Sequence, residues 1–177
     1  VLQAGIDIGF KGFTLGFWSN YQLEDSRLDE TDITLDYTFH LAYKVALSVG
    51  NILYAVDGEN TSEVYLGIGL NMHFDPTLTI YYDHDNAAGD IFATFSIDHT
   101  YALNDAAGLY VGTLASFADN EDYSAFHNAE FSFGLTYALV DQLSLGAGGV
   151  ISTPLSSKAK QVIDDEFMAG VALNLTF

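Results

Sequence analysis

The stretch Phe167-Met168-Ala169-Gly170-Val171-Ala172-Leu173-Asn174-Leu175-Thr176-Phe177 alternates strictly between two kinds of residue. Its odd-numbered residues are all apolar, and its even-numbered ones are mostly small or weakly polar. A period of two predicts a β-strand and not a helix. The length suits a tilted strand that crosses a hydrocarbon layer, which takes roughly 9–11 residues. For this segment alone, the alternative is the last strand of a soluble β-sandwich.

The same stretch resembles the C-terminal strand of bacterial outer-membrane β-barrels, which finishes on Phe. That resemblance implies a partner, the barrel assembly machinery, which reads such strands. The assembly signal would consist of Val171, Leu173, Leu175 and Phe177 on the apolar face.

The composition favours one domain built from strands, covering residues 1–177. Hydrophobic residues make up 49% of the chain, which has 16 Gly, 13 Phe and 11 Tyr but only 2 Pro. No run approaches the roughly 18 apolar residues of a membrane-spanning helix. If the chain lies in a membrane, a closed barrel is the remaining way to satisfy its backbone hydrogen bonds.

The charge balance excludes one class of partner. Asp and Glu number 24 against 5 Lys and Arg, which gives a net charge of −19. Nucleic-acid binding depends on basic residues that neutralise phosphates, so we expect none. The chain has no Cys, which excludes disulfides and thiolate chemistry. Its first residues are already patterned as a strand, so we expect any targeting segment to have been removed or to lie outside this sequence.

Alternation along the whole chain predicts eleven strands. A slip in the pattern near Gly50-Asn51 predicts a β-bulge. The expected strands cover residues 2–10, 13–22, 32–40, 44–55, 62–73, 77–83, 90–101, 106–118, 127–138, 142–151 and 167–177.

The connections between these strands form two classes. Short turns are expected at Lys11, Ala42, Asp75, Asn104 and Asp141, and longer, mostly acidic loops near Asp25, Glu59, Asp85, Asp122 and Ser157. Outer-membrane barrels have short periplasmic turns at one rim and longer extracellular loops at the other. The connections therefore predict short turns on the periplasmic side and long loops outside the cell.

The two faces of the strands point to the same class of protein. One face carries Leu, Ile, Val, Phe and Ala, whereas the other carries Gly, Ser, Thr, Asn and Asp. A soluble barrel would place the apolar face inside and more charge outside. We therefore predict an all-β, antiparallel, up-and-down transmembrane β-barrel with lipid outside and a polar lumen. Near the short turns, an interfacial aromatic girdle would comprise Tyr37, Tyr43, Phe74, Tyr101 and Tyr137.

The strand count predicts a larger parent barrel. Single-chain bacterial barrels have an even number of strands and both chain ends at the periplasm. Eleven strands that finish at the short-turn rim imply about twelve in the parent, the first being absent from this sequence. Ten strands, with one misread, is the alternative.

Several segments resemble Gcw_chp, an uncharacterised family of proteobacterial outer-membrane proteins. They are Gln3-Ala4-Gly5-Ile6-Asp7, Gly12-Phe13, Gly16-Phe17-Trp18-Ser19-Asn20, Gly50-Asn51-Ile52-Leu53-Tyr54 and Thr61-Ser62-Glu63-Val64-Tyr65-Leu66-Gly67. These segments lie in roughly the first 70 residues. The resemblance implies an additional strand before the first one seen here, and the family has no established activity to carry over.

Acidic residues on the polar face are the candidate functional residues. By alternation they are Asp7, Asp32, Asp36 and Asp98, together with Asp83 and Glu130. Rings of carboxylates select cations over anions, so they predict a cation-favouring lumen. The alternative is a lumen filled by side chains or loops, in which these acids are hydrogen-bonded to hydroxyl groups.

Further acids gather at the long-loop rim, where clustered carboxylates would suit calcium. Solvated loop charge is the preferred interpretation, because the spacing of a helix-flanked calcium loop is absent. These acids are Glu24, Asp25, Asp29, Glu30, Asp57, Glu59, Asp83, Asp85, Asp90, Asp119, Glu121, Asp122, Asp164 and Asp165.

The five histidines and one Asp-His-Asp segment are candidates for a metal or catalytic site. His40, His73, His84, His99 and His127 are scattered, and we expect interfacial polar residues there and no metal site. Asp83-His84-Asp85 resembles the Asp and His pairing of barrel proteases, but adjacent residues on a strand point to opposite faces. No Gly-x-Ser-x-Gly motif occurs.

The sequence thus predicts a protein of the outer membrane of a Gram-negative bacterium, in contact with its lipid. Its function would be that of a narrow passive channel favouring cations or small solutes. We expect no enzyme activity, cofactor or metal. The alternative is a structural or partner-binding barrel with a plugged lumen, for which the sequence identifies no protein partner.

Overall fold

The structure is a computed structural model that describes residues 1–177, Ala42 by its backbone alone. Each strand is hydrogen-bonded to its neighbour in sequence, giving one eleven-stranded sheet in the order β1 to β11. The predicted all-β, up-and-down topology is confirmed, and closure of the sheet into a barrel stays a prediction. The elements are β1 (Leu2–Phe10), β2 (Phe13–Gln22), β3 (Arg27–Ala42), β4 (Val45–Val56), β5 (Glu59–Leu70), β6 (Thr77–Asp83), β7 (Ile91–Ala102), β8 (Ala107–Asp119), β9 (Ser124–Val140), β10 (Leu143–Pro154), η1 (Ala159–Gln161) and β11 (Glu166–Leu175).

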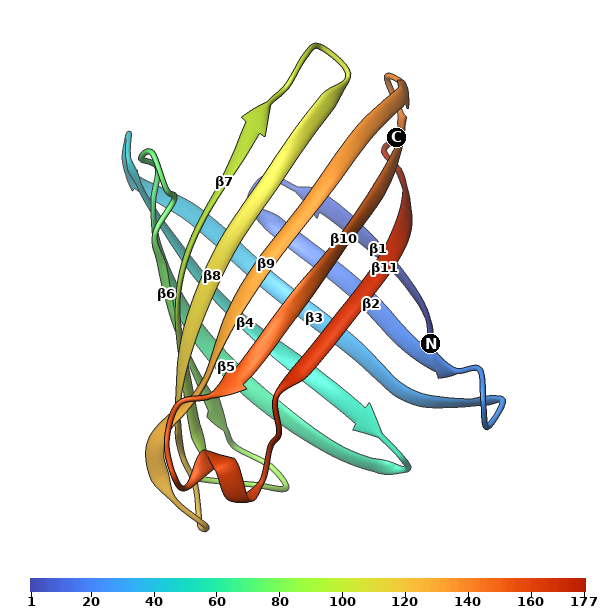
Figure 1. The fold of residues 1–177 in the computed structure, drawn as a ribbon. Helices are drawn as coiled ribbons and strands as arrows, with labels where there is room; N and C mark the ends of the chain where they lie inside the picture. Colours follow the sequence, from blue (N-terminus) through green and yellow to red (C-terminus); the bar gives the residue numbers. More distant parts are fainter. The chain divides into compact units, whose positions relative to one another are not determined.

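The chain divides into two compact units. Unit 1 comprises Val1–Leu70, Leu78–Ala93 and Asp119–Asp122, and unit 2 comprises Asn71–Thr77, Thr94–Ala118 and Tyr123–Phe177. In unit 1, β1 to β5 run side by side as consecutive antiparallel hairpins (Figure 1). In unit 2, β9, β10 and β11 pair in the same way.

The two faces of unit 1 differ in exposure as they differ in chemistry. Leu35 and Leu66, on the apolar face, are 54% and 57% exposed. Their sequence neighbours on the other face, Asp36 and Tyr65, are only partly exposed. The same alternation of exposed apolar and sheltered polar residues continues along β6.

A conventional hydrophobic core is almost missing. Among the described side chains, the buried apolar ones are Ala118 and Ala159, and Ser116 is the largest that is fully buried. Soluble proteins rarely expose contiguous apolar patches of more than a few hundred Å². Exposed Leu, Ile and Phe side chains on this scale are typical of a surface that contacts a membrane or another molecule.

Two-residue turns join several of the hairpins. The turn Lys11-Gly12 has positive φ at both residues, 50° and 89°, and so does the turn Asp57-Gly58, at 52° and 89°. Positive φ at both central residues is the geometry that matches the twist of two paired strands. The predicted short turn at Lys11 is confirmed, whereas the expected longer acidic loop near Glu59 is wrong, because β5 already begins there.

Other predicted boundaries also need correction. The loop expected from residue 23 to about 31 is short, because β3 begins at Arg27 and pairs it with Gln22. The turn expected at residues 41–43 lies at 43–44. β5 ends at Leu70 and not at His73, since Asp75 closes a turn by donating its N–H to the Met72 carbonyl at 3.0 Å.

The bulge predicted at Gly50-Asn51 is wrong. The pairing of β3 with β4 passes through these residues without a shift, with Asp36 opposite Gly50 and Leu35 opposite Asn51. The slip in alternation arises because Asn51 occupies the apolar face. Its amide is satisfied there by the side chain of Ser62, at 3.0 Å, and by the backbone carbonyl of Glu63, at 2.9 Å.

The residues of the proposed assembly signal lie on β11 and just beyond it. Val171 pairs with Ala147 and Leu173 with Leu145 on β10, and both side chains are largely exposed. Separately, none of the helical structure in the described residues is long and apolar enough to span a membrane.

The turn geometry gives a first prediction. Gly58→Ala lowers the free energy of unfolding by about 1 kcal/mol, because a Cβ is disfavoured at positive φ. A Cβ at Gly58 would meet no atom within 4 Å, so the cost is conformational. The measurement is urea unfolding in detergent micelles, followed by the fluorescence of the single Trp18.

The matched control is Gly170→Ala. A Cβ there also meets no atom within 4 Å, but the residue does not have positive φ. Its stability stays at or slightly above the wild-type value. Equal losses for the two substitutions would contradict the conformational explanation.

Candidate functional site: the polar wall and the loop rim

The polar face of unit 1 brings carboxylates and aromatic rings together across four strands. We call it the polar wall and define it by Asp32, Asp36, Tyr54, Glu63, Tyr65 and Tyr81. The register explains the arrangement: Asp32 lies opposite Trp18 on β2 and Tyr54 on β4. Tyr65 and Tyr81 pack with their ring centroids 5.6 Å apart.

The donors to these carboxylates are neutral. Tyr54 Oη donates to Glu63 Oε2 at 2.9 Å, and Tyr65 Oη donates to Asp36 Oδ2 at 2.6 Å. Thr38 Oγ1 donates to Asp36 Oδ1 at 2.8 Å. A hydroxyl donor satisfies an oxygen without cancelling its charge. These contacts therefore leave the wall negative.

Asp32 differs from the other acids of the wall. Its Oδ1 atom is buried and has no hydrogen-bond partner among the described residues. A buried acceptor without a donor costs about 1–3 kcal/mol. Asp32 therefore lowers stability where it stands.

Asp83 was predicted as a lumen-facing acid, and the structure gives it a different task. Its side chain is buried, at 3% exposure. Oδ2 accepts from Thr61 Oγ1 at 2.5 Å, and Oδ1 accepts from the N–H groups of Asp85 and Ala87 at 2.8 and 3.2 Å. Asp83 thus anchors the loop between β6 and β7.

The neighbouring histidine is held elsewhere. Nε2 of His84 lies 3.2 Å from the amide nitrogen of Asn51, whereas the Asp83 carboxylate binds Thr61 and the loop backbone. The two side chains therefore have separate partners.

The remaining predicted acids are distributed over both units. In unit 1, Asp7 leans over Gly16, so that a Cβ on that glycine would lie 2.7 Å from Oδ1. Asp98 and Glu130 belong to unit 2. Asn128 Nδ2 donates to Glu130 Oε1 at 3.0 Å, again a neutral donor.

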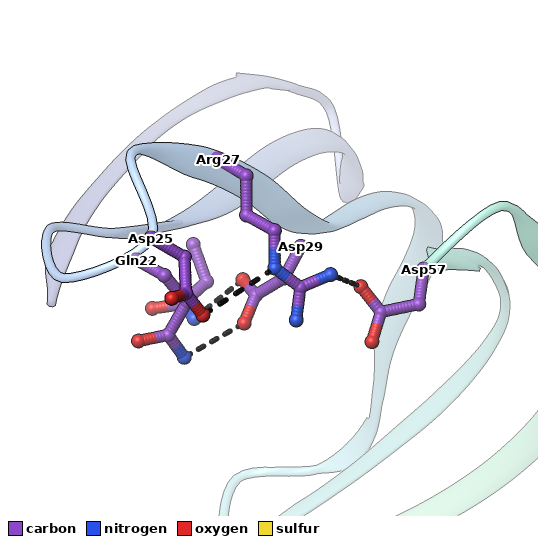
Figure 2. Close-up of polar contacts among 6 residues, drawn as sticks. Gln22, Asp25, Arg27, Asp29 and Asp57 are labelled. Atoms are coloured by element: carbon purple, nitrogen blue, oxygen red, sulfur yellow. Dashed lines mark hydrogen bonds and ion pairs between the residues drawn. The ribbon is translucent and has the colours of Figure 1, made fainter.

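The one ion-pair cluster described lies at the rim, where β2, β3 and the Asp57-Gly58 turn meet (Figure 2). Arg27 Nη1 donates to Asp57, and its Nε lies 3.9 Å from Asp25. The hydrogen bond to Asp57, followed by that residue's charge, raises the pKa of Arg27. Such exposed pairs contribute little to stability. Their effect is to place positive charge beside the rim acids.

Asp29 lies in the same cluster and accepts two amide donors. Gln22 Nε2 donates to Oδ2 at 2.8 Å, and Asn20 Nδ2 donates to Oδ1 at 2.7 Å (Figure 2). The hydrogen bond from Gln22 is the main cause that lowers the pKa of Asp29, and the bond from Asn20 adds to it. Asp29 therefore keeps its charge more readily than an isolated aspartate.

Asp90, in the loop after β6, shows the opposite effect. Burial raises the pKa of its carboxyl, and the charge of Asp83 raises it further, followed by those of nearby rim acids. Clustered acids at this end thus oppose one another's ionisation. No group of three or more His, Asp or Glu side chains within the described residues is arranged to hold a metal ion.

Aromatic rings gather at the short-turn end of both units. In unit 1, Phe13 and Tyr37 pack with centroids 4.5 Å apart. In unit 2, His99 packs against His73 and Tyr101, at 4.7 and 4.5 Å. Three residues of the predicted girdle are therefore part of these clusters: Tyr37, Tyr101 and Phe74, whose ring centroid lies 4.4 Å from that of His73.

Sequence reasoning missed several residues of the wall. Glu63 was not among the candidate acids, and Tyr54 and Tyr65 were not given a role. Alternation alone would have placed Glu63 and Tyr65 on the polar face of β5. The hydrogen bonds that join them to β4 and β3 required the register between strands.

The comparisons with known proteins concern the fold. No protein-family model matches the chain, and no curated protein matches it. A crystal structure of the NanC porin in a rhombohedral form superposes on it with a TM-score of 0.72, at 11% identity, covering 99% of this chain and 92% of the porin. The chain is therefore similar in fold to a porin, and the resemblance to Gcw_chp depends on the segments quoted above.

The cluster at Asp29 gives a prediction for acid stability. Because its folded-state pKa lies below the ordinary value of 3.8, the contribution of Asp29 is fully present above that pH and is lost as the pH falls through the folded-state pKa. Asp29→Asn removes this part of the acid sensitivity. Urea midpoints at pH 6 and pH 3 provide the measurement, with Glu24→Gln in the adjacent turn as control. Equal acid sensitivity of Asp29→Asn and wild type would contradict the assignment.

Asp32, whose Oδ1 has no hydrogen-bond donor, gives a prediction in which loss of a carboxylate increases stability. Asp32→Asn raises the free energy of unfolding by about 1 kcal/mol, because it removes a buried, unpaired charged acceptor. Asp36→Asn, the matched control, lowers it, because both Asp36 oxygens have donors. Urea unfolding followed by circular dichroism measures both. A loss of stability in Asp32→Asn would show that the carboxylate is satisfied.

Proposed function

We propose that this chain forms an outer-membrane β-barrel whose polar wall lines a narrow passive channel favouring cations or small solutes. The observation that carries the proposal is the combination of an exposed apolar face with a polar face whose acids have neutral donors. The likeness in fold to a porin supports the same class of protein.

The membrane location is supported by energetics. Moving a fully exposed Leu, Ile or Phe side chain out of water is favourable by roughly 1.5–3 kcal/mol, and moving a half-exposed one by about half of that. Such side chains occur on the apolar face of successive strands, for example Leu15, Leu35 and Leu66, each at least half exposed. A hydrocarbon layer covers all of them at once, and the aromatic clusters at the short-turn end suit its interface.

The preference for cations is supported by where the basic residues lie. Lys11 and Lys44 lie in turns, Lys158 and Lys160 in the segment between β10 and β11, and Arg27 at the first position of β3. None of the five basic residues therefore lies among the carboxylates of the polar wall. A path lined by one sign of charge concentrates the opposite ion.

Orientation and partners complete the proposal. The longer acidic loops would face the outside of a Gram-negative cell and the short turns the periplasm, as in other barrels of this kind. The C-terminal residues Val171, Leu173, Leu175 and Phe177 would be read by the barrel assembly machinery. We infer no catalytic role, since Asp83 and His84 have separate partners.

One observation favours a second function, a structural or partner-binding barrel with a plugged lumen. The rings of Tyr65, Tyr81 and Phe92 follow one another on the same side of the sheet, with centroid separations of 5.6 and 6.4 Å. Side chains of this size fill a narrow barrel. The two functions differ in whether ions pass.

Planar-bilayer recording tests the proposal. The purified protein gives stepwise conductance, and a KCl gradient gives a reversal potential of the sign expected for K⁺ preference. Asp32→Asn reduces that preference, because it removes a wall charge that other residues leave uncompensated. Absence of steps would favour the plugged barrel, and a preference for Cl⁻ would contradict the role of the carboxylates.

A further inference from the structure

Asp36, Gly50 and Tyr65 lie in one row across three neighbouring strands of unit 1, and we call these three residues the strap. Asp36 on β3 lies opposite Gly50 on β4, and Gly50 lies opposite Tyr65 on β5. Tyr65 reaches over the whole width of β4, because its Oη donates to Asp36 Oδ2 at 2.6 Å. The side chain therefore lies along the wall.

Gly50 makes this path possible. A Cβ on Gly50 would lie 2.4 Å from Cζ and 2.5 Å from Oη of Tyr65, closer than real atoms approach. Any other residue would push the ring away from the sheet. Gly50 has no positive φ, so its role here is to leave space and not to permit an unusual backbone conformation.

The other contacts fix both ends of the strap. Thr38 holds the second oxygen of Asp36 at 2.8 Å, so the carboxylate has a donor on each side. The ring of Tyr81 packs against that of Tyr65, 5.6 Å away between centroids. Neither contact brings a positive charge to Asp36.

We propose that Tyr65 is a positioning residue for the channel: seated on Gly50, it fixes the carboxylate of Asp36 as a charge-selective point and keeps its own ring out of the ion path. This inference rests on the proposed channel function and adds Asp36, held by this strap, to Asp32 as a source of the channel's charge selectivity. A carboxylate held at both oxygens keeps its charge at one place on the wall. A ring released from Gly50 projects away from the sheet and narrows the path.

Three substitutions separate the parts of the strap. Asp36→Asn removes the charge and lowers the K⁺ over Cl⁻ permeability ratio by about tenfold, because a unit charge at roughly 6 Å in water favours K⁺ and disfavours Cl⁻ by about threefold each. Tyr65→Phe keeps the ring but releases the carboxylate, and lowers the ratio less. Gly50→Ala keeps charge and hydroxyl but unseats the ring, and lowers the unitary conductance.

A rescue and a control distinguish this role from a structural one. In the Gly50→Ala background, Tyr65→Ala removes the displaced ring and restores the unitary conductance. Tyr82→Phe is the control, because Tyr82 lies on the exposed apolar face of β6. This substitution leaves the permeability ratio and the unitary conductance unchanged. Wild-type values in both Tyr65→Phe and Gly50→Ala, with a change in Asp36→Asn, would overturn the inference and leave the channel function intact.

A second measurement does not depend on conductance. The chain has no Cys, so Thr34→Cys on the polar face of β3, between Asp32 and Asp36, introduces a single reactive thiol. A cationic methanethiosulfonate reagent modifies it faster than an anionic one. The ratio of the two rates falls in Asp36→Asn and, less, in Tyr65→Phe. An unchanged ratio in Tyr65→Phe, or no modification by either reagent, would overturn the inference even if the wild-type protein passes no ions.

Discussion

Hydrogen bonding between neighbouring strands is the constraint on which the rest of the structure depends. Every strand is paired with the next in sequence, so the backbone of each inner strand is satisfied on both sides. Pairing fixes the register, and register divides the side chains into two faces with no further freedom. Leu35 and Asp36 must therefore lie on opposite sides of β3, and a sheet of such strands needs two different environments.

The polar face has to satisfy its own groups, because few bases are available to it. The sheet does so with hydroxyls and amides from other strands, as Tyr54 does for Glu63 on the adjacent strand and Tyr65 does for Asp36 two strands away. Glycine supplies the space that a long side chain needs to reach across a strand, which Gly50 illustrates. Satisfaction of hydrogen bonds and retention of negative charge are thus achieved by the same contacts.

Alternation along the sequence was sufficient to predict the strands, because it depends on nearest neighbours only. It could not predict contacts that depend on two distant segments. Asn51 broke the pattern and suggested a bulge, but its partner Ser62 on the next strand allows an amide on the apolar face. Asp57-Gly58 is a pair typical of two-residue hairpin turns, but the segment was predicted as a longer acidic loop. Asp83 had the parity of a lumen acid, yet the loop that folds back on it decides its role.

The acids of unit 1 therefore differ in function according to their partners and not according to their spacing. Asp83 is buried by backbone donors of its own loop, and its charge serves local structure. Asp57 is paired with Arg27 at the rim, where solvent weakens the effect of both charges. Asp36 accepts hydrogen bonds from two neutral donors. One oxygen of Asp32 has no donor, and this unpaired oxygen lowers the stability of the fold. Stability alone would favour a neutral residue at Asp32, so the packing of unit 1 gives no reason for a carboxylate there, whereas the proposed cation-favouring channel would give one.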